Sequence, residues 1–155
     1  MKKFVLAIFA LCAFASVNAQ GLRGGVNLGV PIGDVSNFSS FFGSIDLDYD
    51  WEVSESIDVG AATGFAYYFG KDGFDGFKYL PLAGSVDVGV SDDISVGGDV
   101  GYAISLESGG GGDFLYRFQV RYQASEDVDI SARMNNISGD GITFTSLTAG
   151  VGLRF

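Results

Sequence analysis

Apolar and polar residues alternate along most of this 155-residue chain. Alternation with a period of two is typical of β-strands, because successive side chains of a strand point to opposite faces of the sheet. Eight segments carry the pattern, at about 22–32, 43–53, 57–69, 78–90, 94–106, 114–124, 128–136 and 143–155. The pattern therefore predicts an all-β protein with eight strands.

The connections between these segments alternate in length. A short polar turn recurs three times, reading VSESIDVG at 53–60, VSDDISVG at 90–97 and ASEDVDIS at 124–131. The other four connections are longer and rich in glycine, at 33–42, 70–77, 107–113 and 137–142. Outer-membrane barrels combine short periplasmic turns with longer external loops in this way. We therefore expect an eight-stranded antiparallel up-and-down transmembrane β-barrel, with both chain ends on the side of the short turns.

The composition of the two strand faces indicates which face is inside. Apart from Lys78 at the start of the 78–90 segment, the apolar face carries no charge, whereas the polar face holds many small residues, such as Gly60, Gly64 and Gly97. Small side chains suit the narrow lumen of a barrel, and this favours the apolar face outside, against lipid. A soluble secreted barrel that binds a ligand in an apolar interior is the alternative.

Aromatic residues gather near the strand ends, where membrane barrels carry interfacial girdles. The predicted girdle comprises Tyr49, Trp51, Tyr67, Phe69, Tyr102, Tyr116 and Tyr122.

The same parity sends thirteen charged residues into the lumen. They are Arg23, Asp46, Asp48, Asp50, Glu52, Asp58, Asp87, Asp99, Arg117, Arg121, Asp129, Arg133 and Arg154. The interior of an eight-stranded barrel is only wide enough for side chains, and buried charges have to be paired. We therefore predict a salt-bridged and largely closed lumen.

Depth along the strands suggests partners within this set. Asp46 lies at the depth of Arg117, Asp50 and Asp87 at that of Arg121, and Asp48 and Asp99 at that of Arg133. The alternative is a cation path along the acids of the second segment, in a narrow channel.

Residues 1–19 have the features of a secretory signal peptide. Lys2 and Lys3 precede an apolar run that is too short to span a bilayer, and small residues follow at the end of the run. We expect residues 1–19 to be removed and 20–155 to form the barrel domain. Acylation of Cys12 is the disfavoured alternative, because bulky Leu11 precedes it.

Charge and residue content exclude several functions. Without Lys2 and Lys3, seven basic residues face nineteen acidic ones, a net charge of −12 that argues against nucleic acid or anionic lipid as an electrostatic partner. The chain contains no histidine, the usual base of hydrolases and acyl transferases, so we do not expect an enzyme. No motif indicates a cofactor or a metal ion.

The last strand carries the most specific resemblance. Its apolar positions are Leu147, Ala149, Val151, Leu153 and Phe155. Together with the signal segment and the hairpins, this strand resembles the small bacterial outer-membrane barrels of the OmpA/OmpX-like superfamily.

The resemblance implies export by the general secretory route and a place in the bacterial outer membrane, among lipid and lipopolysaccharide. It also implies that the final strand is read by the barrel-assembly machinery. The expected function is a structural or interaction role without catalysis. A narrow porin-like channel or a small-molecule transport barrel is the alternative.

Overall fold

The computed structural model describes residues 21–139 and 141–155. The expected signal peptide, 1–19, lies outside these residues. The described residues form eight strands and one short 3-10 helix, which are β1 (Leu22–Ile32), η1 (Gly33–Asn37), β2 (Ser39–Ser54), β3 (Ile57–Gly70), β4 (Phe77–Gly89), β5 (Ile94–Ser105), β6 (Gly112–Gln123), β7 (Val128–Ser138) and β8 (Thr143–Arg154).

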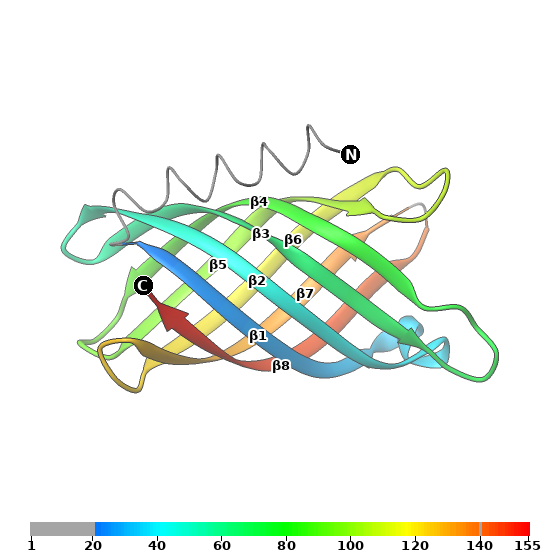
Figure 1. The fold of residues 1–155 in the computed structure, drawn as a ribbon, viewed down its shortest axis with the longest axis horizontal. Helices are drawn as coiled ribbons and strands as arrows, with labels where there is room; N and C mark the ends of the chain where they lie inside the picture. The colour runs from blue at the N-terminus through cyan, green and yellow to red at the C-terminus, as the bar shows by residue number, and fades with distance from the viewer. Residues whose placement is uncertain (1–20, 140) are drawn as a thin grey trace.

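The strands close into one barrel, in which each is antiparallel to its neighbours in the sequence and β8 pairs with β1. The three short turns and the chain end lie together at one end of the barrel, and the loops and η1 lie at the other (Figure 1). We call these the turn end and the loop end. The expected eight-stranded antiparallel up-and-down barrel is confirmed.

Strand β2 differs most from its expected bounds, since it begins at Ser39 rather than near residue 43. The loop before β2 therefore comprises only residues 33–38. Its η1 turn is held by the Ser36 hydroxyl, which donates to the Gly33 carbonyl. The register of β2 against β3 shifts between Ser39 and Phe41.

The outer surface of the barrel is apolar. Every strand exposes large apolar side chains, for example Leu28 of β1 at 54%, Val100 of β5 at 58% and Phe118 of β6 at 57%. Nine charged side chains are instead buried in the lumen, from Arg23 to Arg133. Within the described ranges, no helix is long and apolar enough to cross a membrane.

The lumen has two halves of opposite character. From the turn end to its middle it is filled with charged and amide side chains. Toward the loop end it is filled with apolar and aromatic ones.

Candidate functional site: the charged lumen and its plug

Asp46 of β2 is the centre of the deepest charge cluster. Its side chain is 1% exposed and accepts from Nη1 of Arg133 at 2.5 Å, and it lies 3.5 Å from Nη1 of Arg117. The Asn27 amide also donates to it, at 2.6 Å. Arg117 in turn forms a salt bridge with Asp99 of β5 at 2.6 Å. Two guanidinium groups thus share one carboxylate across the barrel.

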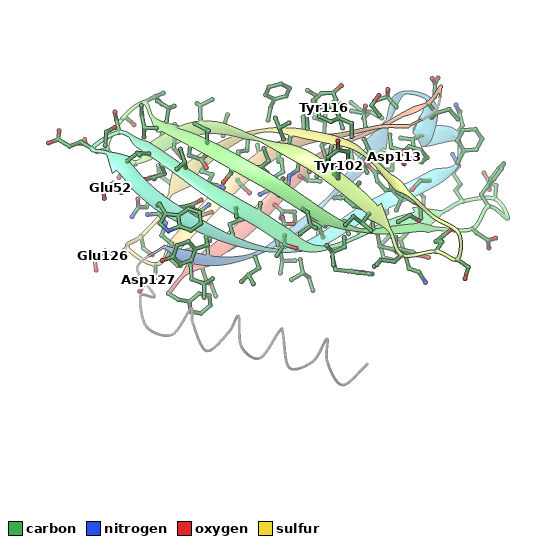
Figure 2. The ribbon with its side chains drawn as sticks, turned by 90° about the horizontal axis from the view of Figure 1, so that it is seen from above. Glu52, Tyr102, Asp113, Tyr116, Glu126 and Asp127 are labelled. Atoms are coloured by element: carbon green, nitrogen blue, oxygen red, sulfur yellow. The ribbon has the colours of Figure 1, made fainter. Side chains whose placement is uncertain are left out.

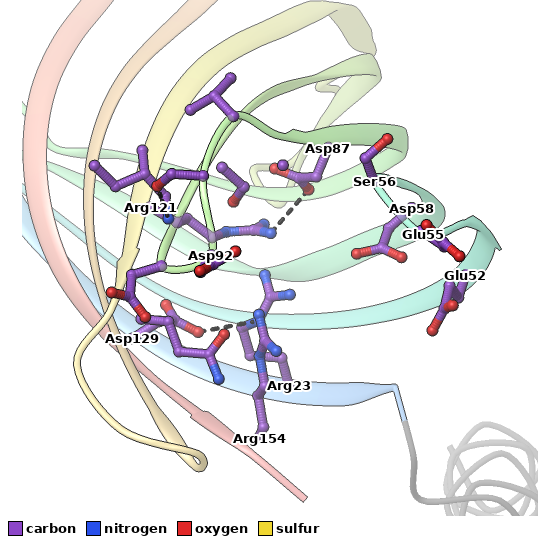
Figure 3. Close-up of a pocket in the computed structure, with 17 residues that line it drawn as sticks. Arg23, Glu52, Glu55, Ser56, Asp58, Asp87, Asp92, Arg121, Asp129 and Arg154 are labelled. Carbon is purple, nitrogen blue, oxygen red and sulfur yellow. Dashed lines mark hydrogen bonds and ion pairs between the residues drawn. The ribbon is translucent and has the colours of Figure 1, made fainter.

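A second cluster lies nearer the turn end. Arg121 of β6 pairs with Asp87 of β4 at 2.8 Å, and Arg23 of β1 pairs with Asp129 of β7 at 3.2 Å (Figure 3). Arg23 also donates to Asp50 of β2. The first pair reaches across one intervening strand, β5, and the second across β8, so both join strands that are not neighbours in the barrel.

Most of the predicted lumen charges lie where the parity puts them. Ten of the thirteen form salt bridges, which are Arg23, Asp46, Asp48, Asp50, Asp87, Asp99, Arg117, Arg121, Asp129 and Arg133. Six acids share four arginines, so the network contains two more acids than cations.

Three of the predicted residues differ. Glu52 and Arg154 are exposed, and Asp58 is half-buried, so these three lie at the open mouth rather than inside the network. The reason is their position near the strand ends. Glu52 lies beside a register shift in β2, and Arg154 is the last residue of β8.

The salt-bridge partners predicted from equal depth along the strands were partly right. Asp46 with Arg117, and Arg121 with Asp87 and Asp50, are the pairs that the structure contains. Arg133 forms its salt bridge with Asp46, whereas Asp48 and Asp99 were the expected partners. Barrel shear displaces strands on opposite walls along the axis, which depth counted along each strand does not include.

Inward-facing glycines make room for the acids. A Cβ on Gly97 would collide with the Asp87 carboxylate, and one on Gly152 would lie 2.7 Å from Oδ1 of Asp129. A Cβ on Gly60 would likewise meet Asp50. These three glycines therefore leave the volume that a neighbouring carboxylate occupies.

The turn end opens into a vestibule, a cavity of about 580 Å³. Its walls carry seven acids and three arginines, which are Glu52, Glu55, Asp58, Asp87, Asp92, Asp93, Asp129, Arg23, Arg121 and Arg154 (Figure 3). The next cavity inward is only about 10 Å³, close to the size of one water molecule. The wide part of the lumen therefore stops at the charge clusters.

An aromatic plug closes the loop-end half. Its buried members are Val35, Phe42, Ala66, Tyr68, Tyr79, Ala103, Leu115 and Ile137, with Phe77, Ala83 and Phe144 packed against them. The rings of Phe42 and Tyr68 are 4.7 Å apart, and Phe77 lies 5.7 Å from Tyr79. The Tyr68 hydroxyl donates to Ser146 at 3.2 Å, which satisfies its polar end.

The plug was not predicted from the sequence. The signal was present where the alternation fails, in the consecutive apolar residues Phe41 and Phe42 and in the run Tyr67, Tyr68 and Phe69. In each run, one ring faces outward and its neighbour faces the lumen.

The residues of the predicted girdle lie near both ends of the barrel on its outer face. Tyr49, Trp51 and Tyr122 are near the turn end, whereas Tyr67, Phe69, Tyr102 and Tyr116 are near the loop end. In Figure 2, Tyr102 and Tyr116 are separated along the barrel from Glu52, Glu126 and Asp127 of the turn end. The five predicted residues of the assembly signal, from Leu147 to Phe155, are all exposed on the outer face of the final strand.

In the lumen, the buried carboxylates and guanidinium groups compensate one another's charge. Within the described part of the chain, no group of three or more acids, histidines or cysteines is placed to hold a metal ion. The buried carboxylates face guanidinium groups, which oppose their use as bases or metal ligands.

No protein-family model matches the sequence, and no curated protein does either. Solved structures do. The attachment invasion locus protein Ail of Yersinia pestis matches with a TM-score of 0.60 at 18% identity, over 88% of this chain and 99% of Ail.

Two other structures match comparably. Neisserial surface protein A matches with a TM-score of 0.55 at 16% identity, over 86% of this chain and 96% of that one. The outer membrane enzyme PagL matches with a TM-score of 0.60 at 14% identity, over 86% and 99%. The chain thus has the fold of the eight-stranded outer-membrane β-barrels and is similar to Ail, Neisserial surface protein A and PagL.

Proposed function

We propose that this protein is an integral barrel of the bacterial outer membrane, with a structural or interaction role, a closed lumen and no catalytic activity. One observation carries the proposal, which is the inverted polarity of the barrel. Large apolar residues face outward from every strand, and nine charged side chains of the described residues are buried in the lumen.

The energetics of this inversion favour a lipid environment. Leaving a Val, Leu, Ile or Phe side chain in water forgoes about 1.5–3 kcal/mol relative to burial. Exposed residues of this kind occur on all eight strands, so in water the barrel surface would be one continuous apolar patch. A bilayer covers this surface, and a soluble barrel has nothing comparable to cover it.

The alternative of a soluble ligand-binding barrel requires an apolar interior pocket. The vestibule is lined mostly by charged and polar side chains, and the apolar half of the lumen is filled by the plug. This arrangement supports the membrane proposal over the soluble one.

The remaining features fit the same location. In this proposal, residues 1–19 direct export, and the aromatic residues near both ends lie at the two interfaces. The final strand, from Leu147 to Phe155, is read by the assembly machinery. The loop end faces outward, because long loops are external in such barrels.

The relatives in structure include binding proteins as well as an enzyme. Ail is named for attachment and invasion, and it was also solved with a heparin analogue. PagL is an enzyme. The present chain has no histidine and keeps its buried carboxylates in salt bridges, which supports an interaction role over catalysis.

Fractionation and gel mobility test the location. The full chain is expressed in a Gram-negative host, outer membranes are isolated, and boiled and unboiled samples are compared on a gel. We expect recovery with the outer membrane and faster migration without boiling, as for a closed, stable barrel. A protein recovered in the soluble periplasmic fraction, with no mobility shift, would contradict the proposal.

A narrow channel is the second candidate, and the open acidic vestibule is what favours it. The plug opposes it. In planar bilayers we expect no current steps from the parental protein, whereas Phe42→Ala, Tyr68→Ala and Tyr79→Ala combined should open a cation-selective path. Steps from the parental barrel would support the channel instead.

A further inference from the structure

A small cavity adjoins the vestibule on its inner side. We call this cavity of about 10 Å³ the inner cavity, and it shares Arg23, Arg121 and Asp129 with the vestibule. A volume of this size holds about one water molecule. The charged residues that line it are three arginines and three acids, which are Arg23, Arg121, Arg133, Asp46, Asp48 and Asp129.

Asp48 is an acid of the inner cavity that has no close partner. It is 5% exposed, and its Oδ1 atom has no hydrogen-bond partner within the part of the chain that the structure describes. Its Oδ2 atom lies 4.0 Å from Nη1 of Arg23 and 3.9 Å from Nη2 of Arg121. These distances are too long for hydrogen bonds, so the buried carboxylate lacks the donors that would offset its lost hydration.

Arg23 offers a donor that is equally unused. Its Nη2 atom donates to Asp50, and its Nε atom lies 3.2 Å from Oδ2 of Asp129. Its Nη1 atom is buried and has no hydrogen-bond partner among the described residues. An acceptor on Asp48 and a donor on Arg23 therefore lie on the same cavity, separated by the kind of distance that a water molecule bridges.

Gly25 of β1 provides the free space. It lines the inner cavity and is half-buried, and a Cβ on it would lie 3.6 Å from the nearest atom, the carbonyl oxygen of Val151. Gly152 lines the same cavity, but a Cβ there would lie 2.7 Å from Oδ1 of Asp129. A methyl group therefore fits at Gly25 with ordinary contacts, in space that belongs to the cavity.

We propose that the inner cavity binds one water molecule, which donates to the Asp48 carboxylate and accepts from Nη1 of Arg23. The balance of charge in the lining selects water over an ion. A cation would face three guanidinium groups and an anion would face three carboxylates, whereas water both donates and accepts. Solvent from the vestibule then extends one molecule deeper, as far as Asp48.

Gly25→Ala follows from this assignment with an unusual sign. Replacing glycine by alanine where the backbone allows it normally stabilises a protein, because the unfolded chain loses freedom. At Gly25 the new methyl group would exclude the water and leave Asp48 and Arg23 without their hydrogen bonds, which costs more than the gain. Gly84→Ala is the matched control, because Gly84 faces outward and its Cβ would lie 3.9 Å from the nearest atom.

The test uses the protein purified from outer membranes. Crystals of the parental barrel and of both alanine variants are grown in rubidium bromide, so that a bound cation or anion is recognised by its anomalous scattering. The urea midpoints of the three proteins are measured in phosphatidylcholine vesicles.

We expect one density peak of the height of a single oxygen in the parental barrel and in Gly84→Ala, within hydrogen-bond distance of Asp48 and of Nη1 of Arg23. This peak should show no anomalous signal. In Gly25→Ala the peak should be lost and the urea midpoint should fall below that of the parental barrel, whereas the midpoint of Gly84→Ala should be equal or higher.

Three results would overturn the inference. They are a parental structure without the peak at a resolution that shows the waters of the vestibule, an anomalous rubidium or bromide signal at the site, and a Gly25→Ala barrel at least as stable as the parental one. Each of these concerns the lumen alone, so the membrane location would still be decided by fractionation.

Discussion

Asp46→Asn tests the charge network at its deepest point. Asp46 holds Arg133 at 2.5 Å, and among the salt bridges of the described residues this is the one that involves Arg133. Arg117, by contrast, keeps Asp99 at 2.6 Å when Asp46 is neutralised. The amide keeps the size of the carboxylate, so the substitution removes the charge with little change in packing and leaves the buried Arg133 uncompensated.

The cost follows from that uncompensated charge. Breaking a buried ion pair by removing one partner destabilises a protein by about 3–5 kcal/mol. With a denaturant slope of about 2 kcal/mol per molar urea, the unfolding midpoint should fall by ~2 M. Asp58→Asn is the matched control. This carboxylate is half-buried at the mouth, where screening leaves about 0–1 kcal/mol to lose.

Trp51 provides the assay. It is the single tryptophan of the chain and is 52% exposed on the outer face, so its fluorescence reports the loss of its lipid contact when the barrel unfolds in urea from phosphatidylcholine vesicles. Arg133→Met is then added to Asp46→Asn. Removing both charges should recover a large part of the lost stability, because the uncompensated guanidinium is gone.

Two results would refute the reasoning. One is a double variant no more stable than Asp46→Asn alone, since the cost would then not come from Arg133. The other is an equal cost for Asp46→Asn and Asp58→Asn, which would place Asp46 in water rather than in a closed lumen.

Three further outcomes are expected. Gly97→Val should destabilise the barrel by about 1–3 kcal/mol in urea titrations, because the new side chain would collide with the Asp87 carboxylate. Gly84→Val should be nearly neutral, because Gly84 faces outward and a Cβ there would lie 3.9 Å from the nearest atom. Val100→Arg in the middle of β5 should cost about 2–4 kcal/mol in vesicles, and Val90→Arg at the turn about 0–1 kcal/mol, because a lipid-facing charge is least tolerated at the bilayer midplane. Phe155→Ala should slow assembly, measured as the rise of the heat-modifiable form over time, without changing the urea midpoint, and an unchanged rate would argue against Phe155 as part of the assembly signal.

The strands were predictable because the residues of a barrel wall alternate between two environments. Each residue faces either lipid or lumen, so the period of two is unbroken across segments of this length. The ends of β1, β3 and β5 lie within one residue of the expected bounds. The start of β2 was missed by four residues, because the consecutive phenylalanines Phe41 and Phe42 interrupt the alternation on which the prediction depends.

The lumen was predictable in content but less so in arrangement. Parity identified the charged residues, since apart from Lys78 at the loop end of β4 no charge shares the apolar face. Parity does not specify how far the sheet shears when it closes, and so Arg133 was assigned to Asp48 and Asp99 rather than to Asp46. It also does not specify where the wall ends, and so Glu52 and Arg154 were counted as interior residues.

The division of the lumen into a charged half and an aromatic half determines what it can do. Six acids share four arginines, in a network that opens toward the vestibule at the turn end. The plug holds no charge and contains Tyr68 and Tyr79, both almost fully buried. A cation that enters the vestibule therefore finds attractive acids at the mouth but no polar route past the rings. An ion crossing the plug would lose its hydration with no compensating partner. In the closed barrel that we propose, charge enters from one end and stops at the other, so removal of the plug, rather than of the salt bridges, should be required for conduction.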